Sequence, residues 1–133
     1  MKSAFLGCAI YAIALSILVE SHIVSYAIID LFVRTPYVIG THTEDWMSWH
    51  GMGCLFLGLV NLAAWRWPLG HASRDVAFAT AVVYGAWTIQ NFYFTAFTDR
   101  FVPFMWLHVI GCGVAAAASV WVGLRLRSGA SIG

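Results

Sequence analysis

Four long apolar runs divide the chain, and short polar stretches separate them. The runs cover about residues 3–33, 46–67, 76–97 and 103–124. A helix that crosses a bilayer needs about 20 mostly apolar residues, and each run is long enough. The connections between the runs are too short to fold independently. The pattern therefore predicts an all-α integral membrane four-helix bundle, surrounded by lipid, that forms one domain over residues 1–133.

The first apolar run is longer than a bilayer requires. Its roughly 31 residues would extend about 46 Å as one helix, against a hydrocarbon core of about 30 Å. The helix must therefore tilt, bend or project beyond the bilayer. Its second half contains Glu20, His22 and Asp30, so we expect this half to face protein or water rather than lipid.

Charge and cysteine content narrow the function classes. The chain is 61% hydrophobic and 10% charged, with a net charge of +1. Because it lacks the clustered Lys and Arg that neutralise phosphates, we expect no nucleic-acid partner. Its cysteines are isolated within apolar runs, which argues against disulfides and thiolate zinc sites. Most cations fall on the side of the bundle that holds both termini, which predicts cytoplasmic termini: Lys2, Arg66, Arg74, Arg125 and Arg127.

The polar residues inside the runs share one depth in the predicted bundle. His50 lies one turn inside the second helix, and His108 lies in the second turn of the fourth. Asn91 and Tyr93 lie near the end of the third helix, and Glu20 of the first reaches a similar depth. Polar groups are costly in lipid and commonly mark function. We therefore expect the functional site in this layer.

The second helix carries a stripe of small and polar residues below its histidine. His50, Cys54, Gly58 and Asn61 recur at helical spacing and share one face. Small residues allow close approach of a flat surface, which is either a neighbouring helix or a planar cofactor. The sequence leaves both interpretations open. His108 heads a similar stripe in the fourth helix and is the rival metal ligand.

The third helix presents polar residues on two faces. Trp87 and Asn91 share one face with Tyr84, while Tyr93 projects almost oppositely. Both faces need partners, which favours a homo-oligomer. Alternatively, Tyr93 belongs to an aromatic belt at the membrane surface.

Two motifs resemble those of the bacterial styrene oxide isomerases. One is the string Trp46-Met47-Ser48-Trp49-His50-Gly51, similar to the W-xxx-H-x-G signature that opens the family's second helix. The other runs from Gly85 through Trp87 to Phe92-Tyr93, similar to the family's G-W-xxxx-F-Y string. The resemblance covers roughly residues 46–100. The family has asparagine where this chain has Phe56 and aspartate where it has Tyr84.

The resemblance implies a homotrimer in a bacterial inner membrane that binds haem b between protomers. It implies that His50 is the axial ligand to ferric iron. If this haem is the planar cofactor of the small-residue stripe, we expect Cys54 and Gly58 to lie against it, with Trp46 and Trp87 as further contacts. The iron acts as a Lewis acid that opens an epoxide of a small hydrophobic substrate, and a 1,2-shift gives a carbonyl compound. Tyr93 would orient the substrate oxygen, and Asn61 or Asn91 would replace the family's asparagine. No CxxCH segment is present, so any haem is expected to bind without a covalent link.

Three other functions remain open on the sequence. A b-type electron carrier would use both His50 and His108 as haem ligands. A haem-independent isomerase of a lipid or terpenoid would use Glu20, His22 and the surrounding Trp and Tyr rings to protonate an alkene and stabilise a carbocation. Glu20 could equally be the interfacial end of a tilted helix. A non-enzymatic transporter subunit or assembly factor is the fourth possibility.

Overall fold

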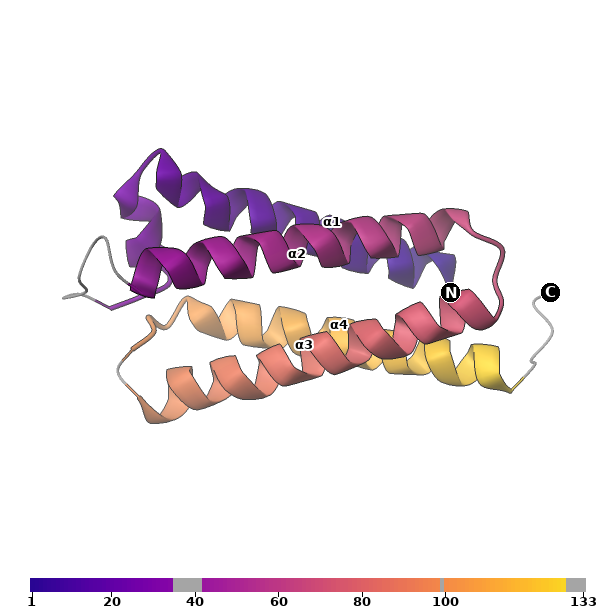
Figure 1. Cartoon of the computed structure of the whole chain (residues 1–133). Helices are drawn as coiled ribbons and strands as arrows, with labels where there is room; N and C mark the ends of the chain where they lie inside the picture. The colour runs from indigo at the N-terminus through magenta and orange to yellow at the C-terminus, as the bar shows by residue number, and fades with distance from the viewer. Residues whose placement is uncertain (35–41, 99, 129–133) are drawn as a thin grey trace.

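The computed structural model describes residues 1–34, 42–98 and 100–128. This part of the chain is helical (Figure 1), with α1 at Lys2–Glu20, α2 at His42–Arg66, α3 at His71–Phe97 and α4 at Met105–Arg127. Two 3₁₀ turns, η1 at Ser21–Ile23 and η2 at Tyr26–Leu31, follow α1. The all-helical prediction is confirmed for the described residues.

The first helix ends earlier than the sequence predicted. A single helix over 3–33 is wrong: α1 stops at Glu20. The reason is local. The Ser21 hydroxyl donates to the carbonyl of Ile17 at 2.7 Å, and Nδ1 of His22 lies 2.8 Å from the carbonyl of Val19. The backbone then tightens into η1, where Val24 N–H donates to the carbonyl of Ser21 three residues back, and the helical course ends at Ser25, whose backbone is extended (φ −150°, ψ 116°).

The other helices differ from the predicted spans at their ends. α2 begins at His42 rather than Trp46, and α3 begins at His71 rather than residue 76. In the first turn of α3, the Ser73 hydroxyl donates to the carbonyl of Pro68 at 3.0 Å, which ties this turn to the segment before the helix. α4 begins at Met105 rather than Pro103, because the backbone N–H groups of residues 105–107 bond three residues back, in tighter turns than an α-helix.

The four helices pack as two antiparallel pairs. Figure 1 shows α1 lying along α2, and α3 lying along α4. Close approach within the pairs depends on glycine. Gly58 of α2 lies against Ile13 and the Ala9 backbone of α1, and Gly123 of α4 lies against the ring of Phe78. Between the pairs the backbones lie further apart, and buried side chains such as Leu57, Tyr84 and Cys112 fill the space. We call the interface between the pairs the seam.

The seam is closed at the η2 end by backbone hydrogen bonds. Val33 and Phe101 form an isolated antiparallel bridge. Beside it, Val102 N–H donates to the Phe32 carbonyl at 3.1 Å, and Arg34 N–H donates to the Arg100 carbonyl at 2.9 Å. The segment after α1 is thereby tied to the connection between α3 and α4.

The chain is a membrane protein by the length and apolarity of its helices. Among the described residues, the spans Lys2–Ile23, Met47–Arg66 and Met105–Arg127 have mean hydropathies of 1.9, 1.2 and 1.8. Large apolar side chains cover their outer faces, including Ile17, Phe56 and Leu107. Four spans were expected, and three meet this description. α3 begins with a charged turn and carries buried polar residues further along, which lowers its hydropathy.

Candidate functional site

His50 lies inside the bundle against residues from two other helices. Its imidazole centroid is 4.7 Å from the indole of Trp87 on α3 and 5.4 Å from the imidazole of His108 on α4. The two histidine rings are nearly perpendicular, at 84°. The structure thus brings together three residues that the sequence singled out. It does so across the seam, because α2 belongs to one helix pair and α3 and α4 to the other.

Tyr11 of α1 also contacts His108, through its hydroxyl group. The Tyr11 hydroxyl oxygen lies 2.8 Å from Nδ1 of His108 and 3.3 Å from the carbonyl oxygen of the same residue. One arrangement uses all three groups: the hydroxyl donates to the carbonyl and accepts from Nδ1–H. In that tautomer, Nε2 of His108 keeps a lone pair. It is then able to accept a proton or bind a metal.

Further aromatic and thiol groups complete the cluster. Tyr84 has its ring 5.9 Å from that of Tyr11 and 5.8 Å from that of Trp87, and its hydroxyl donates to the Cys8 carbonyl at 3.2 Å. The Cys112 sulfur lies 3.7 Å from both ring nitrogens of His108. We call this cluster the histidine layer; it comprises Tyr11, His50, Tyr84, Trp87, His108 and Cys112.

Two buried polar atoms near this layer have no hydrogen-bond partner among the described residues. One is Oε1 of Glu20, and the other is Nδ2 of Asn91. Glu20 reaches from the end of α1 to α2, where a methyl group on Gly51 would overlap its carboxyl group. Asn91 is 2% exposed and lies one turn from Trp87 on the same helix face. Buried unpaired groups are costly, so both atoms are candidates for ligand contact.

The small-residue stripe below His50 is covered by helices of the same chain. Cys54 and Asn61 are completely buried, and Gly58 lies against α1. Asn61 donates from Nδ2 to the hydroxyl oxygen of Thr80 at 3.0 Å. Of the two interpretations that the sequence left open, the structure therefore supports helix packing. A porphyrin does not fit along this stripe, and next to His50 it would have to displace the Trp87 indole.

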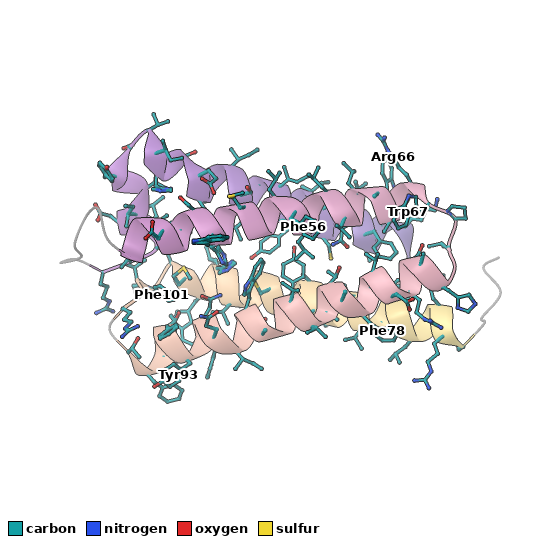
Figure 2. The ribbon with its side chains drawn as sticks, viewed as in Figure 1. Phe56, Arg66, Trp67, Phe78, Tyr93 and Phe101 are labelled. Atoms are coloured by element: carbon teal, nitrogen blue, oxygen red, sulfur yellow. The ribbon has the colours of Figure 1, made fainter. Side chains whose placement is uncertain are left out.

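The remaining predicted residues lie apart from the layer or outside the described side chains. Tyr93 is 54% exposed and packs against Phe94 and Phe97, pointing away from the bundle (Figure 2). This position is typical of an aromatic belt. His22 is buried against the Val19 carbonyl at the end of α1. The side chain of Trp46 lies outside the described residues.

Sequence reasoning missed Tyr11 and Thr80. Tyr11 is the one tyrosine in α1, and this hydroxyl within an apolar helix was the available signal. Its partner is 97 positions away, so spacing along the chain gave no indication of the contact. Nothing in the local sequence distinguishes Thr80 from another helical threonine. Its role depends on contact with Asn61 of α2.

The donor set is rich in imidazole and poor in charged ligands. Among the described residues, no group of three or more His, Cys, Asp or Glu side chains is arranged to hold a metal ion. The layer offers two imidazoles, aromatic faces and the Tyr11 hydroxyl. These groups are suited to moving a proton and to stabilising positive charge.

Comparisons with known protein families, with curated proteins and with solved structures find no match to this chain.

Proposed function

We propose that the chain is a membrane-embedded isomerase that converts a hydrophobic epoxide into a carbonyl compound. The observation that carries the proposal is the contact of His50 with both His108 and Trp87 across the seam. Two imidazoles at this distance can together donate one proton to a substrate and take it back. The adjacent indole face can stabilise positive charge that develops on carbon.

The unpaired amide group of Asn91 supports an oxygen-containing substrate. Nδ2 of Asn91 is a buried donor without a described acceptor, on the helix face that also carries Trp87. An epoxide oxygen accepts hydrogen bonds and has no hydrogen to donate. The surroundings of the layer are apolar, which favours a hydrophobic substrate drawn from the membrane.

The reaction is balanced by one proton that leaves and returns. A protonated imidazole of the His50–His108 pair gives its proton to the epoxide oxygen, and a C–O bond breaks toward that oxygen. A hydride then moves, with its electron pair, from the carbon that bears oxygen to the cationic carbon. The O–H proton returns to imidazole as the C=O bond forms. No oxidant or reductant is consumed.

A second candidate is a b-type haem protein in which His50 and His108 are both axial ligands. The contact between the two imidazoles, which come from different helices α2 and α4, supports this candidate. Haem held by His50 alone would supply Lewis-acid chemistry for the same isomerisation, but the packing of Trp87 and α1 gives it no space along the α2 stripe. Binding between the histidines would require the two helix pairs to separate.

A lipid or terpenoid with an isolated double bond is a further substrate class for the same layer. The buried Glu20 oxygen beside Gly51 supports it, because a carboxyl group at this depth could protonate an alkene. Activity on such a substrate would depend on Glu20. Opening of an epoxide would depend on the histidine pair.

We also propose that the chain forms a homo-oligomer and that its termini face the cytoplasm. The outward position of Tyr93 on α3 leaves a face for a neighbouring copy, as in a homotrimer. The starts of α1 and α3 and the ends of α2 and α4 lie at one end of the molecule (Figure 1). This end carries Lys2, Arg74 and Arg127, which supports cytoplasmic termini in a bacterial inner membrane.

The function is tested with purified protein in nanodiscs and a panel of aryl and long-chain alkyl epoxides. Product analysis by gas chromatography is expected to show aldehyde or ketone with unchanged elemental composition. A substrate deuterated at the migrating position is expected to keep its deuterium. Loss of the label to water, or no turnover of any epoxide, would contradict the proposal. An absorption spectrum with a low-spin bis-histidine Soret band would establish the second candidate instead.

A further inference from the structure

A second polar site lies in the seam, away from the histidine layer. It consists of Asn61 on α2 and Thr80 on α3, and both side chains are completely buried. Eleven residues separate Asn61 from His50, which is roughly 16 Å along the helix axis. The isomerase proposed above makes no use of this pair.

The hydrogen bonds of Asn61 fix the orientation of its amide. Nδ2 donates to the Leu57 carbonyl at 2.9 Å and to the Thr80 hydroxyl oxygen at 3.0 Å. Exchanging the amide nitrogen and oxygen would turn Oδ1 toward the Leu57 carbonyl, where two acceptors would face each other. Both amide hydrogens are therefore used. Oδ1 of Asn61 is left as a fully buried acceptor without a donor among the described residues.

Thr80 is in the complementary position. Its oxygen accepts from Asn61, and its hydroxyl hydrogen has no acceptor among the described residues. Other threonines of α3 behave differently: the hydroxyls of Thr88 and Thr95 each donate to the carbonyl four residues back. The pair thus holds one unused acceptor and one unused donor on side chains that already contact each other.

We propose that the Asn61–Thr80 pair is a binding site for one hydroxyl group. The hydroxyl oxygen accepts from Thr80 O–H, and the hydroxyl hydrogen is donated to Oδ1 of Asn61. With the Nδ2 to Thr80 bond, these contacts close a ring of three hydrogen bonds that joins α2 to α3. A hydroxyl is the smallest group that both accepts and donates at one atom. The source is either a buried water or the hydroxyl of a membrane alcohol.

The burial of the pair favours water as the source. Buried waters characteristically occupy such places, where they satisfy polar groups that the chain leaves unpaired. A long-chain alcohol would have to pass between α2 and α3, and both side chains are 0% exposed. The bound hydroxyl would join the two helix pairs across the seam, through α2 and α3.

The test is infrared difference spectroscopy of the full chain in nanodiscs, comparing H₂¹⁶O with H₂¹⁸O. We expect a sharp O–H stretching band that shifts with ¹⁸O in the wild type and is absent in Thr80→Val. Thr88→Val is the matched control and is expected to keep the band, because the Thr88 hydroxyl is already satisfied within α3. Thr80→Val preserves side-chain shape, so the variant should fold; Asn61→Leu is the second variant.

A membrane alcohol gives a different result in the same experiment. The O–H band is then insensitive to ¹⁸O, and native mass spectrometry finds an alcohol bound to the wild type and not to Thr80→Val. Either source supports the site. The proposal is overturned if the wild type and Thr80→Val show the same ¹⁸O-sensitive bands and the same bound masses.

Discussion

At the scale of single residues, the geometry of the histidine layer depends on the side chains that contact each imidazole. His108 is fixed through Nδ1 by Tyr11, and His50 is flanked by the Trp87 indole. An imidazole whose orientation is fixed keeps one nitrogen directed for chemistry. In the proposed isomerase, Tyr11 is a positioning residue that acts through His108.

Replacing Tyr11 with phenylalanine tests this role. Tyr11→Phe removes the hydroxyl that contacts Nδ1 and the carbonyl of His108. We expect a loss of about 1–3 kcal/mol in the free energy of unfolding, because a buried polar group loses its partner. The loss is measured by unfolding the purified protein in mixed micelles. Tyr93→Phe, at an exposed position, is the control and should change stability little; equal effects of the two substitutions would contradict the assignment.

At the scale of helices, the apolar runs predicted most of the secondary structure, and only the depth of polar residues pointed to a contact across the seam. The runs located four helices because apolar length and polar breaks are local properties of the sequence. The end of α1 at Glu20 was missed because the apolar run continues past it and conceals the tighter turns of η1 and the extended backbone at Ser25. The depth argument located His50 and His108 together. It could not identify Tyr11 or Thr80, whose partners depend on how the helix pairs meet.

The packing of α1 on α2 through Gly58 gives a prediction at this scale. A Cβ at Gly58 would lie 2.6 Å from Cγ1 of Ile13 and 3.3 Å from the Ala9 carbonyl oxygen. Because backbone atoms limit relaxation, we expect Gly58→Ala to destabilise the protein by about 1–3 kcal/mol.

Gly85→Ala is the matched control, measured in the same way. A Cβ at Gly85 of α3 would meet nothing within 4 Å. The substitution is expected to stabilise the helix by about 0.5–1 kcal/mol, since alanine has less backbone freedom to lose. If Gly58→Ala were as well tolerated as Gly85→Ala, α1 and α2 would not be in close contact.

At the scale of the whole molecule, two helix pairs meet along a seam where buried side chains of all four helices pack around several polar groups. The pairs are joined at the η2 end by backbone bonds and further along by the histidine layer and the Asn61–Thr80 pair. In the proposed isomerase, a hydrophobic substrate would reach the histidines from the lipid by separation of the two helix pairs along this seam.

The orientation of the molecule is tested by cysteine labelling in sealed vesicles. Arg74 and Arg127 lie at the end of the molecule opposite Asp30, and each of the three is replaced by cysteine in turn. The native cysteines Cys8, Cys54 and Cys112 are buried. An impermeant maleimide is expected to label the first two variants only in inverted vesicles, and Asp30→Cys only in right-side-out vesicles. Labelling of Arg74→Cys and Asp30→Cys from the same side would contradict the proposed topology.

The central claim is that the His50–His108 pair carries out an isomerisation. The most direct measurement is the turnover of epoxide by purified wild type, His50→Asn and His108→Asn, with folding checked by circular dichroism. His71→Asn, at an exposed position in the first turn of α3, is the control. General acid–base catalysis contributes about 10²–10⁴-fold, and we expect each layer variant to lose activity within that range while His71→Asn matches the wild type. Folded layer variants that turn over epoxide at the wild-type rate would contradict the account.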